Sequence, residues 1–463
     1  STNNNTMTKK KKISLSLLLV AVVAGSIICI TRWYTWFGNI PEPAYTTANM
    51  PQRILLTLGN EGEFSRIISW QCDTTLHSGE VRITEIGSHD TTTIKAEGTV
   101  VGSRSGKSAF YHAELNGLKP SARYSYQVRN TNKESGWASF AMPDANAQTP
   151  FSFTFMGDIQ DSVGGLSASI FQHIAKMDTA PSFCMFGGDL IERPMDEYWK
   201  LVFNDWGSVA RSVPIVACTG NHEYIKGTTR TLDARFPYVF AYFLKSQTEG
   251  DMTYSFSYKG VRFFLLDSNV DFWHLGDQAE WLENGLKASK EKWKVVVLHH
   301  PIYSNKGSWQ NLPIRWYFKS LIEKYKVDLV LQGHEHVYAR WADKDKDGRP
   351  TTPLFVTSYC SPKNYQLNLN REEDRIGTDD RFFLRINASN DSLTIQTITT
   401  SNYQPYDKVT ITKQNGEATI KDYYKNVPEK VEVSNWYRKS KTASKVKAYE
   451  QEVNEWKKNH HHQ

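Results

Sequence analysis

The stretch Gly333-His334-Glu335-His336 decides the fold, because it presents two imidazoles directly after a short apolar run. That run, Val327-Asp328-Leu329-Val330-Leu331, is typical of a buried strand that ends at the glycine. Two histidines one residue apart at the end of a strand point toward one pocket, and imidazole is a ligand for zinc, iron, nickel and copper. The pair alone is weak evidence for a metal site, so the other ligands must come from elsewhere in the chain.

Four other apolar runs end in the same way, with a tight exit followed by a polar side chain that carries a lone pair. They lead into Gly157-Asp158, Gly187-Gly188-Asp189, Gly220-Asn221-His222-Glu223 and His299-His300-Pro301. In open α/β sheets, ligands collect beyond the carboxyl ends of the strands. Two Asp, one Asn and three His gathered at that edge would form a two-metal site.

Composition is that of an ordinary globular protein, with 463 residues, 40% hydrophobic and 22% charged. The net charge of +6 lies largely in Lys9–Lys12 and in the lysine-rich C-terminus, so we expect no nucleic-acid-binding face. Five cysteines at irregular spacing, with no CxxC pair, indicate neither a zinc knuckle nor a disulfide framework.

The N-terminus predicts a membrane anchor. A basic tail, 1–12, precedes an apolar run, 13–30, whose length is at the lower limit for crossing a bilayer. Trp33, Tyr34 and Trp36 follow at once, as in an interfacial aromatic belt. Lysines before the run favour an inside N-terminus and a periplasmic or extracellular remainder. The alternative is a cleaved signal peptide, although the apolar run continues past the small residues that would be cut.

The rest of the chain divides into a linker at 31–50, a β-only segment at 51–147, an α/β segment at 150–405 and a C-terminal part at 406–463. In the α/β segment, strands alternate with helices, which we expect over Gln278–Ser289 and Arg315–Lys326. The C-terminal part contains a hairpin that turns at Asn415-Gly416 and then a lysine-rich tail that we expect to be helical and on the surface.

Taken together, the five motifs resemble those of the calcineurin-like metallophosphoesterase superfamily. Within it, the chain is most similar to purple acid phosphatase-like proteins with an N-terminal fibronectin type III-like domain, in which Leu118, Pro120 and Tyr124 would form the tyrosine corner. The resemblance covers roughly residues 50–400. It implies a four-layer α/β/β/α sandwich preceded by an all-β sandwich and, here, an N-terminal transmembrane helix.

The resemblance also implies roles for individual residues. Asp189 would bridge two metal ions, Asp158 and His336 would complete the first site, and Asn221, His299 and His334 would complete the second. The cofactor would be two divalent or mixed-valence ions of iron, zinc or manganese. Such a pair clamps a phosphate and lowers the pKa of a bound water, so that metal-bound hydroxide attacks phosphorus. His222 would touch the phosphate or protonate the leaving alcohol.

Two positions depart from the family pattern. Glu192 stands where purple acid phosphatases have the tyrosine whose iron complex is purple, and Gln160 stands where many relatives have a histidine ligand. We hypothesise that Glu192 orients His222 and that Arg193 grips the substrate phosphate; the alternative is a surface ion pair between Glu192 and Arg193.

Gln160 and His300 have open roles beside the predicted ligands. Gln160 either gives its carbonyl oxygen to a metal or hydrogen-bonds a metal-bound water. His300 follows the ligand His299 on a strand end, so its ring is expected on the opposite side, in a structural hydrogen bond.

The predicted function is a membrane-anchored, outward-facing metallophosphatase that acts on phosphorylated small molecules or lipids. One alternative is a phosphodiesterase or pyrophosphohydrolase acting on nucleotides or lipid head groups. Another is a degenerate binding protein that has kept the scaffold without the chemistry; the retained set of predicted ligands argues against it, since a dead site need keep none of them.

Overall fold

The structure is a computed structural model and describes residues 9–59, 62–161, 165–249, 252–307, 309–370 and 373–460, without the side chains of 9–13 and 15. Residues 1–8 of the predicted basic tail, and the lysine side chains that follow them, lie outside the described part.

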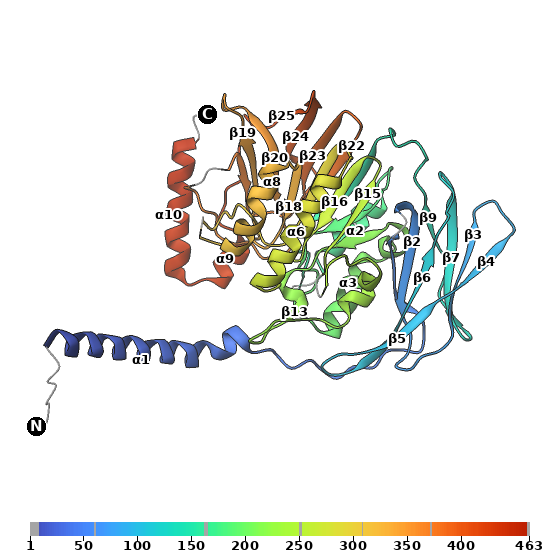
Figure 1. Ribbon diagram of the computed structural model, residues 1–463, viewed down its shortest axis with the longest axis horizontal. Coiled ribbons are helices and arrows are strands. Elements are labelled where there is room, and N and C mark those ends of the chain that lie inside the picture. The colour runs from blue at the N-terminus through green and yellow to red at the C-terminus, as the bar shows by residue number, and fades with distance from the viewer. Residues whose placement is uncertain are drawn as a thin grey trace, which may run out of the picture.

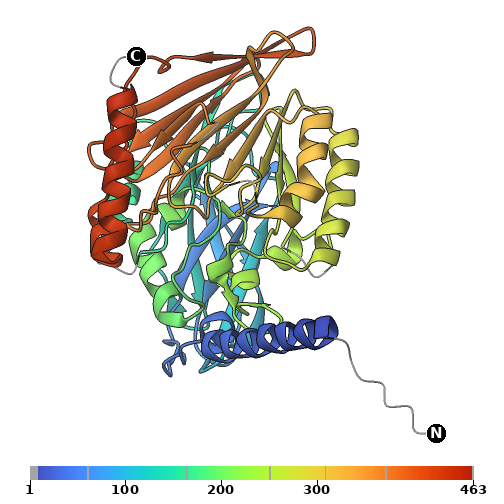
Figure 2. The ribbon, with the colours of Figure 1, turned by 90° about the vertical axis from the view of Figure 1, so that its left-hand side faces the viewer.

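The N-terminal helix α1 (Lys9–Phe37) projects from the body of the protein (Figures 1 and 2). Its apolar part runs from Ser16 to Phe37, with mean hydropathy 2.0 and none of it buried. The helix is longer than the predicted 13–30 and takes in the first residues of the predicted linker. By length and composition it is able to cross a bilayer, as is the apolar part of a signal sequence.

Two small antiparallel sheets follow. One has the order β1 (Gln52–Gly59), β2 (Gly62–Gln71), β6 (Lys107–Leu115), β5 (Glu97–Gly102). The other has the order β4 (Thr91–Lys95), β3 (Gly79–Glu85), β7 (Arg123–Asn130), β8 (Lys133–Glu134), with β9 (Ala138–Ala141) also on β7. Side chains of both sheets share one core, in which Trp70 stacks on Tyr111. The Tyr124 hydroxyl accepts the backbone N–H of Lys119 at 3.0 Å, a bond of the kind that closes a tyrosine corner.

The α/β part is built on two seven-stranded sheets (Figure 1). The first has the order β12 (Ile215–Ala217), β11 (Cys184–Phe186), β10 (Phe151–Met156), β22 (Phe382–Ala388), β23 (Ser392–Thr399), β24 (Pro405–Gln414), β25 (Glu417–Asp422). The second has the order β15 (Tyr254–Tyr258), β16 (Val261–Leu265), β17 (Trp293–Val297), β18 (Leu329–Gln332), β20 (Pro350–Thr357), β19 (Tyr338–Lys344), β21 (Arg375–Gly377). A short hairpin, β13 (Tyr224–Ile225) with β14 (Thr231–Leu232), lies apart from both.

Side chains alternate between the two faces of each strand, which separates the packing layers. On β17, Val295 and Val297 belong to the core shared with the first sheet, whereas Val296 packs toward α6 (Phe272–Ala288) and α8 (Ser320–Lys324). Helices α2 (Ala168–Ala175), α3 (Asp196–Trp206) and α4 (Val209–Ser212) pack on one another, and α5 (Phe236–Val239) contacts β2 and β6 of the β-sandwich.

The two predicted helices differ from the expectation in extent. Helix α6 begins at Phe272, six residues before Gln278, because Asp271 caps it by accepting the N–H groups of Trp273 and His274. The predicted helix Arg315–Lys326 is divided into a π-helical turn, η3 (Arg315–Lys319), and α8, and it follows the short α7 (Leu312–Ile314).

The C-terminal part does not stand apart from the α/β part. The hairpin turns at Asn415-Gly416 as predicted, both residues having positive φ, and it adds β24 and β25 to the first sheet. Helices α9 (Asn435–Ser440) and α10 (Ala443–His460) then pack Tyr437, Tyr449 and Val453 against Val337 and Leu367.

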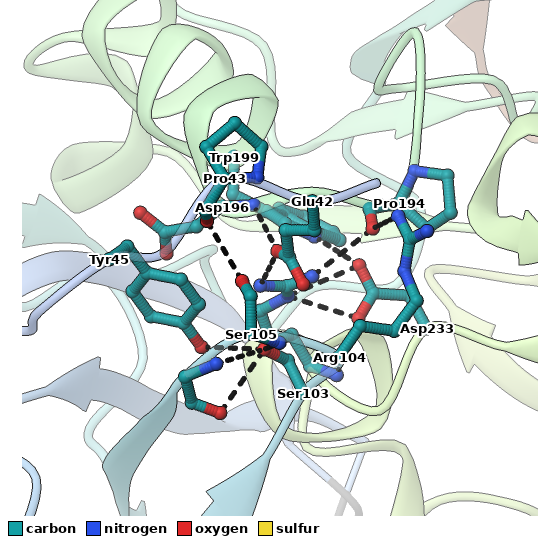
Figure 3. A network of polar contacts seen from close by, with 12 residues as sticks. Glu42, Pro43, Tyr45, Ser103, Arg104, Ser105, Pro194, Asp196, Trp199 and Asp233 are labelled. Atoms are coloured by element: carbon teal, nitrogen blue, oxygen red, sulfur yellow. Dashed lines mark hydrogen bonds and ion pairs between the residues drawn. The ribbon is translucent and has the colours of Figure 1, made fainter. Parts of the chain in front are cut away.

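Residues 38–50, predicted as a linker, are fixed by a polar network between the β-sandwich and the α/β part (Figure 3). Glu42 accepts the Arg235 guanidinium at 2.7 Å and the Asp196 N–H at 2.8 Å. Arg104 donates to the carbonyl oxygens of Ile40 and Pro194, both at 3.0 Å. The Glu42 and Arg235 side chains are almost fully buried, so this segment is part of the fold rather than a tether.

Candidate metal centre

All five motifs of the sequence emerge at one edge of the paired sheets. Strands β10, β11 and β12 are mutually parallel, and so are β16, β17 and β18. The loops that leave five of these strands carry Asp158, Asp189, Asn221, His299 and the pair His334 and His336. Parallel strands bring their carboxyl ends to a common edge, so residues far apart in the chain meet there.

The side chains meet in two groups that share one member. The histidine-rich group consists of Asp189, His299 and His334, and the carboxylate-rich group consists of Asp158, Asp189 and His336. Within each group, the possible ligand atoms all lie within 4.8 Å of one another. Asp189 belongs to both groups, which is the position of a bridging ligand between two metal ions.

Asn221 joins the histidine-rich group. Its Oδ1 lies 2.9 Å from His334 Nδ1 and 3.1 Å from His299 Nε2, and His299 Nε2 lies 3.3 Å from Asp189 Oδ2. In the carboxylate-rich group, His336 Nε2 lies 3.4 Å from Asp158 Oδ1. Three nitrogens and several oxygens therefore converge from six side chains.

Backbone carbonyls orient two of the imidazoles. His299 Nδ1 lies 2.8 Å from the carbonyl oxygen of Gly187, and His336 Nδ1 lies 3.1 Å from that of Lys363. A carbonyl oxygen accepts only from a protonated Nδ1, so Nε2 of each ring is left as the lone-pair donor toward the centre.

The backbone at this edge is held in an uncommon conformation. Asp158, Asp189, His334 and His336 all have positive φ, at 49°, 52°, 72° and 51°. For residues other than glycine this left-handed conformation costs free energy, and it persists where the surrounding structure imposes it, as at ligand sites. Four of the six predicted ligands therefore have this conformation.

Glycines allow the loops to approach this closely. A Cβ at Gly333 would lie 2.5 Å from Asp158 Oδ2, and one at Gly220 would lie 2.1 Å from the backbone N of Asp189. Neither glycine tolerates a side chain without moving a donor of the centre.

Two family matches cover this architecture. Residues 151–338, which contain all six donors, match the family described as calcineurin-like phosphoesterase, and residues 51–142 match the N-terminal domain of purple acid phosphatase. Residues 151–338 therefore form a calcineurin-like phosphoesterase domain. The predicted family and the predicted class of enzyme, a phosphoric ester hydrolase, are thereby confirmed.

Individual relatives agree with the family matches. The chain is 27% identical over 412 residues to the probable purple acid phosphatase 20 of Arabidopsis thaliana, and the match covers 78% of this chain and 88% of the relative. It is 24% identical over 365 residues to the Fe(3+)-Zn(2+) purple acid phosphatase 12 of the same plant, covering 72% and 76%. A solved purple acid phosphatase from yellow lupin seeds shares the fold, with a TM-score of 0.63 and 18% identity over 79% of this chain and 75% of that one.

The two donor groups fit a pair of metal ions, as predicted for the cofactor. Asp158 Oδ1 and the carbonyl oxygen Oε1 of Gln160 are buried and accept no hydrogen bond. Buried oxygens without a donor are costly unless a cation lies beside them. Asp158 is a member of the carboxylate-rich group, and Gln160 follows it by two residues.

Burial and mutual charge set the protonation of the donors. Burial raises the pKa of Asp158 well above its usual range. Burial also opposes ionisation of Asp189, but His299 and His222 outweigh it and hold its pKa well below the usual range. Burial likewise opposes protonation of His299, but Asp189 and Asp158 raise its pKa to about 9, so a metal ion would displace the proton from its Nε2 on binding. Burial lowers the pKa of His336 to about 3, which keeps that imidazole neutral and able to bind a metal.

Glu223 is the functional residue that the sequence analysis missed. Its buried carboxylate accepts the backbone N–H groups of Asp189, Leu190, Ile191 and Gly220 at 2.6–3.2 Å. It thus ties the Asp189 loop to the Asn221 loop. The available signal was the position of Glu223 directly after Asn221-His222, which places it at the same edge.

The expected contact between Glu192 and His222 takes a different form. His222 Nδ1 lies 2.6 Å from the backbone carbonyl of Glu192, whereas both carboxylate oxygens of Glu192 lie 2.6 Å from Lys363 Nζ. A lysine distant in sequence, which the analysis did not consider, takes the carboxylate. Arg193 is exposed and is not the partner of Glu192 in that pair.

Lys363 and Glu192 therefore form an ion pair whose backbone carbonyls contact two histidines of the site. The carbonyl of Glu192 contacts His222 and the carbonyl of Lys363 contacts His336, while their side chains pair with each other. The two side chains are only 12% and 16% exposed, so solvent screens the pair weakly.

The remaining predicted positions lie beside the donors. His300 Nδ1 lies 2.9 Å from the Ser268 hydroxyl, but its ring does not point to the opposite side as expected, since it lies 4.4 Å from the ring of the donor His334. Gln160 Nε2 lies 3.4 Å from Asp189 Oδ2. His222 Nε2 lies 3.9 Å from Asp189 Oδ2 and is more exposed than the donors.

Proposed function

We propose that the chain hydrolyses phosphate esters at a two-metal centre in which Asp189 is the shared ligand. Asp158 and His336 hold one ion, and Asn221, His299 and His334 hold the other. The observation that carries the proposal is the membership of Asp189 in both donor groups. Two ions on one carboxylate are the arrangement that suits in-line displacement at phosphorus.

When bound, the ions supply charge that neutralises the phosphate and lowers the pKa of water. The protein holds the ligands before the ions arrive. Gly187 and Lys363 fix the imidazole orientations through their carbonyl oxygens, and Glu223 ties two of the ligand loops together. Preorganised ligands of this kind need little rearrangement on binding.

His222 is the proposed acid toward the leaving alcohol. Its Nδ1 lies against the carbonyl oxygen of Glu192, and its Nε2, on a partly exposed side chain, lies 3.9 Å from Asp189 Oδ2. An imidazole held in this way delivers a proton from Nε2 to an oxygen that leaves phosphorus. Glu192 acts through His222 and through Lys363, and Arg193 remains the proposed outer contact of the phosphate.

Iron, zinc and manganese are the proposed metals. The donor set combines imidazole with carboxylate and amide oxygens, which suits these ions better than copper or calcium. One relative is named for iron and zinc. Gln160, whose Oε1 has no hydrogen-bond donor, is the proposed additional ligand of the carboxylate-rich group.

We further propose that α1 anchors the protein and that the catalytic part lies outside the cytoplasm. The apolar span, the aromatic residues at its end and the preceding lysines support this orientation. The α/β/β/α layering and the fibronectin III-like character of the first domain belong to the same proposal, supported by the split packing of β17 and by the Tyr124 corner.

The test is hydrolysis of p-nitrophenyl phosphate and its bis-ester by the full chain in detergent, with metal analysis of the same sample. We expect about two metal ions per chain and turnover that chelation abolishes and metal restores. Activity on the bis-ester alone would replace the monoesterase proposal by a diesterase. Metal-loaded protein without activity on either ester would overturn the proposal.

A further inference from the structure

Three tryptophans stand out of the surface of the catalytic part. Trp273, Trp309 and Trp316 are 78%, 83% and 78% exposed, and Phe272 and Leu312 beside them are also exposed. Proteins in water rarely show so many large apolar side chains together, and such patches mark contacts with a partner or a membrane.

Part of this set is a packed cluster. The ring of Phe272 lies 6.0 Å from Trp273, 6.3 Å from Trp316 and 4.9 Å from Tyr317. Trp309 and Leu312 belong to the segment that leads into η3, which carries Trp316. We call the five exposed side chains, Phe272, Trp273, Trp309, Leu312 and Trp316, the aromatic rim.

The aromatic rim lies at the edge that carries the metal centre. It is built from the segments that follow β16 and β17, and β17 leads directly into His299. The segment after β16 touches the centre through Ser268, whose hydroxyl lies 2.9 Å from His300 Nδ1. The rim is therefore part of the surroundings of the centre rather than of the opposite end of the sheets.

The membrane helix leaves from the same edge. Asn39, just after α1, exchanges hydrogen bonds with the backbone of Lys226 at 2.7 and 2.9 Å, and Lys226 Nζ donates to Thr35 at 3.2 Å. Lys226 follows β13, which continues directly from Asn221-His222-Glu223, and β13 lies just above the end of α1 in Figure 1. The chain is thus tied to the apolar span on the side where the metal donors emerge.

The charge around the rim complements an anionic lipid surface. Lys226, Arg230 and Lys306 are exposed on loops of this edge. Tryptophan with flanking cations is the composition of segments that lie in the headgroup region of bilayers.

We propose that the aromatic rim inserts into the interfacial region of the membrane that α1 enters, and that it presents the metal centre to phosphate monoesters carried by lipids. The proposal rests on the proposed phosphoesterase function and deepens it by naming the substrate class. The rim and α1 form two attachments on one edge, so a lipid headgroup reaches the centre without leaving the bilayer surface.

Lipid contact is tested with a fluorescent reporter on the full chain in anionic nanodiscs. Cys29 is the exposed cysteine and the other four are buried, so Cys29→Ser followed by Trp273→Cys or Trp309→Cys gives one labelling site. An environment-sensitive dye there should shift to the blue and be quenched by spin-labelled lipid. Trp137→Cys, an exposed tryptophan of the β-sandwich, is the matched control and should show neither effect.

Equal spectra at the rim and at position 137 would overturn the proposal. A blue shift without lipid quenching that grows with protein concentration would also overturn it, because the rim would then be a contact between copies of the chain.

Activity provides the second arm. The triple variant Trp273→Ser, Trp309→Ser, Trp316→Ser should keep its rate on p-nitrophenyl phosphate within about twofold and lose at least about fivefold on phosphatidic acid in vesicles. Trp137→Ser should change neither rate. An equal loss on both substrates would show a structural defect and contradict the role of the rim. Absence of all hydrolysis in the unchanged protein would instead refute the proposed function, and the dye result would still decide the membrane contact.

Discussion

The two donor groups of the metal centre differ in how far the protein itself satisfies them. In the histidine-rich group, Asn221, His299 and His334 contact one another at 2.9–3.2 Å. In the carboxylate-rich group, Asp158 Oδ1 accepts no hydrogen bond, and burial raises the pKa of Asp158. Both groups gather lone-pair donors that need a cation among them, and the need is plainest in the carboxylate-rich group, where a buried carboxylate oxygen has no hydrogen-bond donor. The ion of the carboxylate-rich group should therefore contribute more to local stability and have fewer strong ligands.

The largest effect is expected from Asp189→Asn, which weakens both groups at once. We predict loss of both ions and a fall of about 10³-fold or more in kcat/KM for p-nitrophenyl phosphate. Metal content and turnover are measured on the same preparation. Asp267→Asn is the control, because Asp267 is a buried carboxylate nearby that accepts Thr219 and Tyr224 and should lower stability without removing metal. Full metal content in Asp189→Asn would contradict the bridging role.

His336→Ala tests most directly whether the two groups hold separate ions. Only the carboxylate-rich group loses a ligand, so we predict one ion retained out of two and a fall of about 10²-fold in turnover. The matched variant His299→Ala should instead lose the other ion. Spectra after cobalt substitution distinguish the remaining sites. Identical spectra for the two variants would mean that the groups are not separate.

The ion pair between Glu192 and Lys363 contacts His222 and His336 through the backbone carbonyls of its two residues. It should affect turnover more than metal binding. We predict that Glu192→Gln lowers kcat about tenfold with both ions retained. The reason is that the ion pair with Lys363 holds in place the two backbone carbonyls that orient His222 and His336. The reversed pair, Glu192→Lys with Lys363→Glu, should recover part of this loss. Metal loss in Glu192→Gln would make Glu192 a ligand.

Gln160 allows the ion affinity of the carboxylate-rich group to be changed on its own. If its unpaired Oε1 serves the ion, Gln160→Leu should weaken binding of that ion about tenfold and leave the other unchanged. Competition with a chelator measures both affinities. Gln160→Glu, which keeps an oxygen at the same place, should retain the metal. Equal affinities in Gln160→Leu and the unchanged protein would assign Gln160 a purely structural role.

Lys245 is a buried charge that no metal ion compensates. A substitution there should change stability and leave catalysis unchanged. Its Nζ donates to Thr57 at 2.8 Å, and burial lowers its pKa from 10.5 to about 7. Between pH 7 and 10.5 the unfolded chain therefore binds more protons than the folded chain, and Lys245 makes stability rise with pH. Below pH 7 the full penalty remains.

Lys245→Met should remove this rise and stabilise the protein at pH 6, by up to a few kcal/mol. Denaturation midpoints at pH 6 and pH 9 measure both effects. A larger rise with pH in Lys245→Met than in the unchanged protein would contradict the buried-lysine account.

The sequence was sufficient for the family, the class of enzyme and the edge at which the donors gather, because each motif follows a strand and parallel strands end together. It was insufficient for contacts made by residues without a motif. Lys363, which takes the carboxylate of Glu192, lies in a segment with no periodic pattern, and the role of Glu223 depends on N–H groups that only the folded loops bring together. The docking of residues 38–50 was missed for the same reason, since Glu42 finds Arg235 only in the folded chain.

The most direct test is a crystal structure of the purified protein with anomalous data collected at the edges of iron, zinc and manganese. The account predicts two peaks about 3.5–4 Å apart, both bound by Asp189, one also by His299 and His334 and the other by Asp158 and His336. A single peak, or two peaks that do not share Asp189, would contradict the central claim.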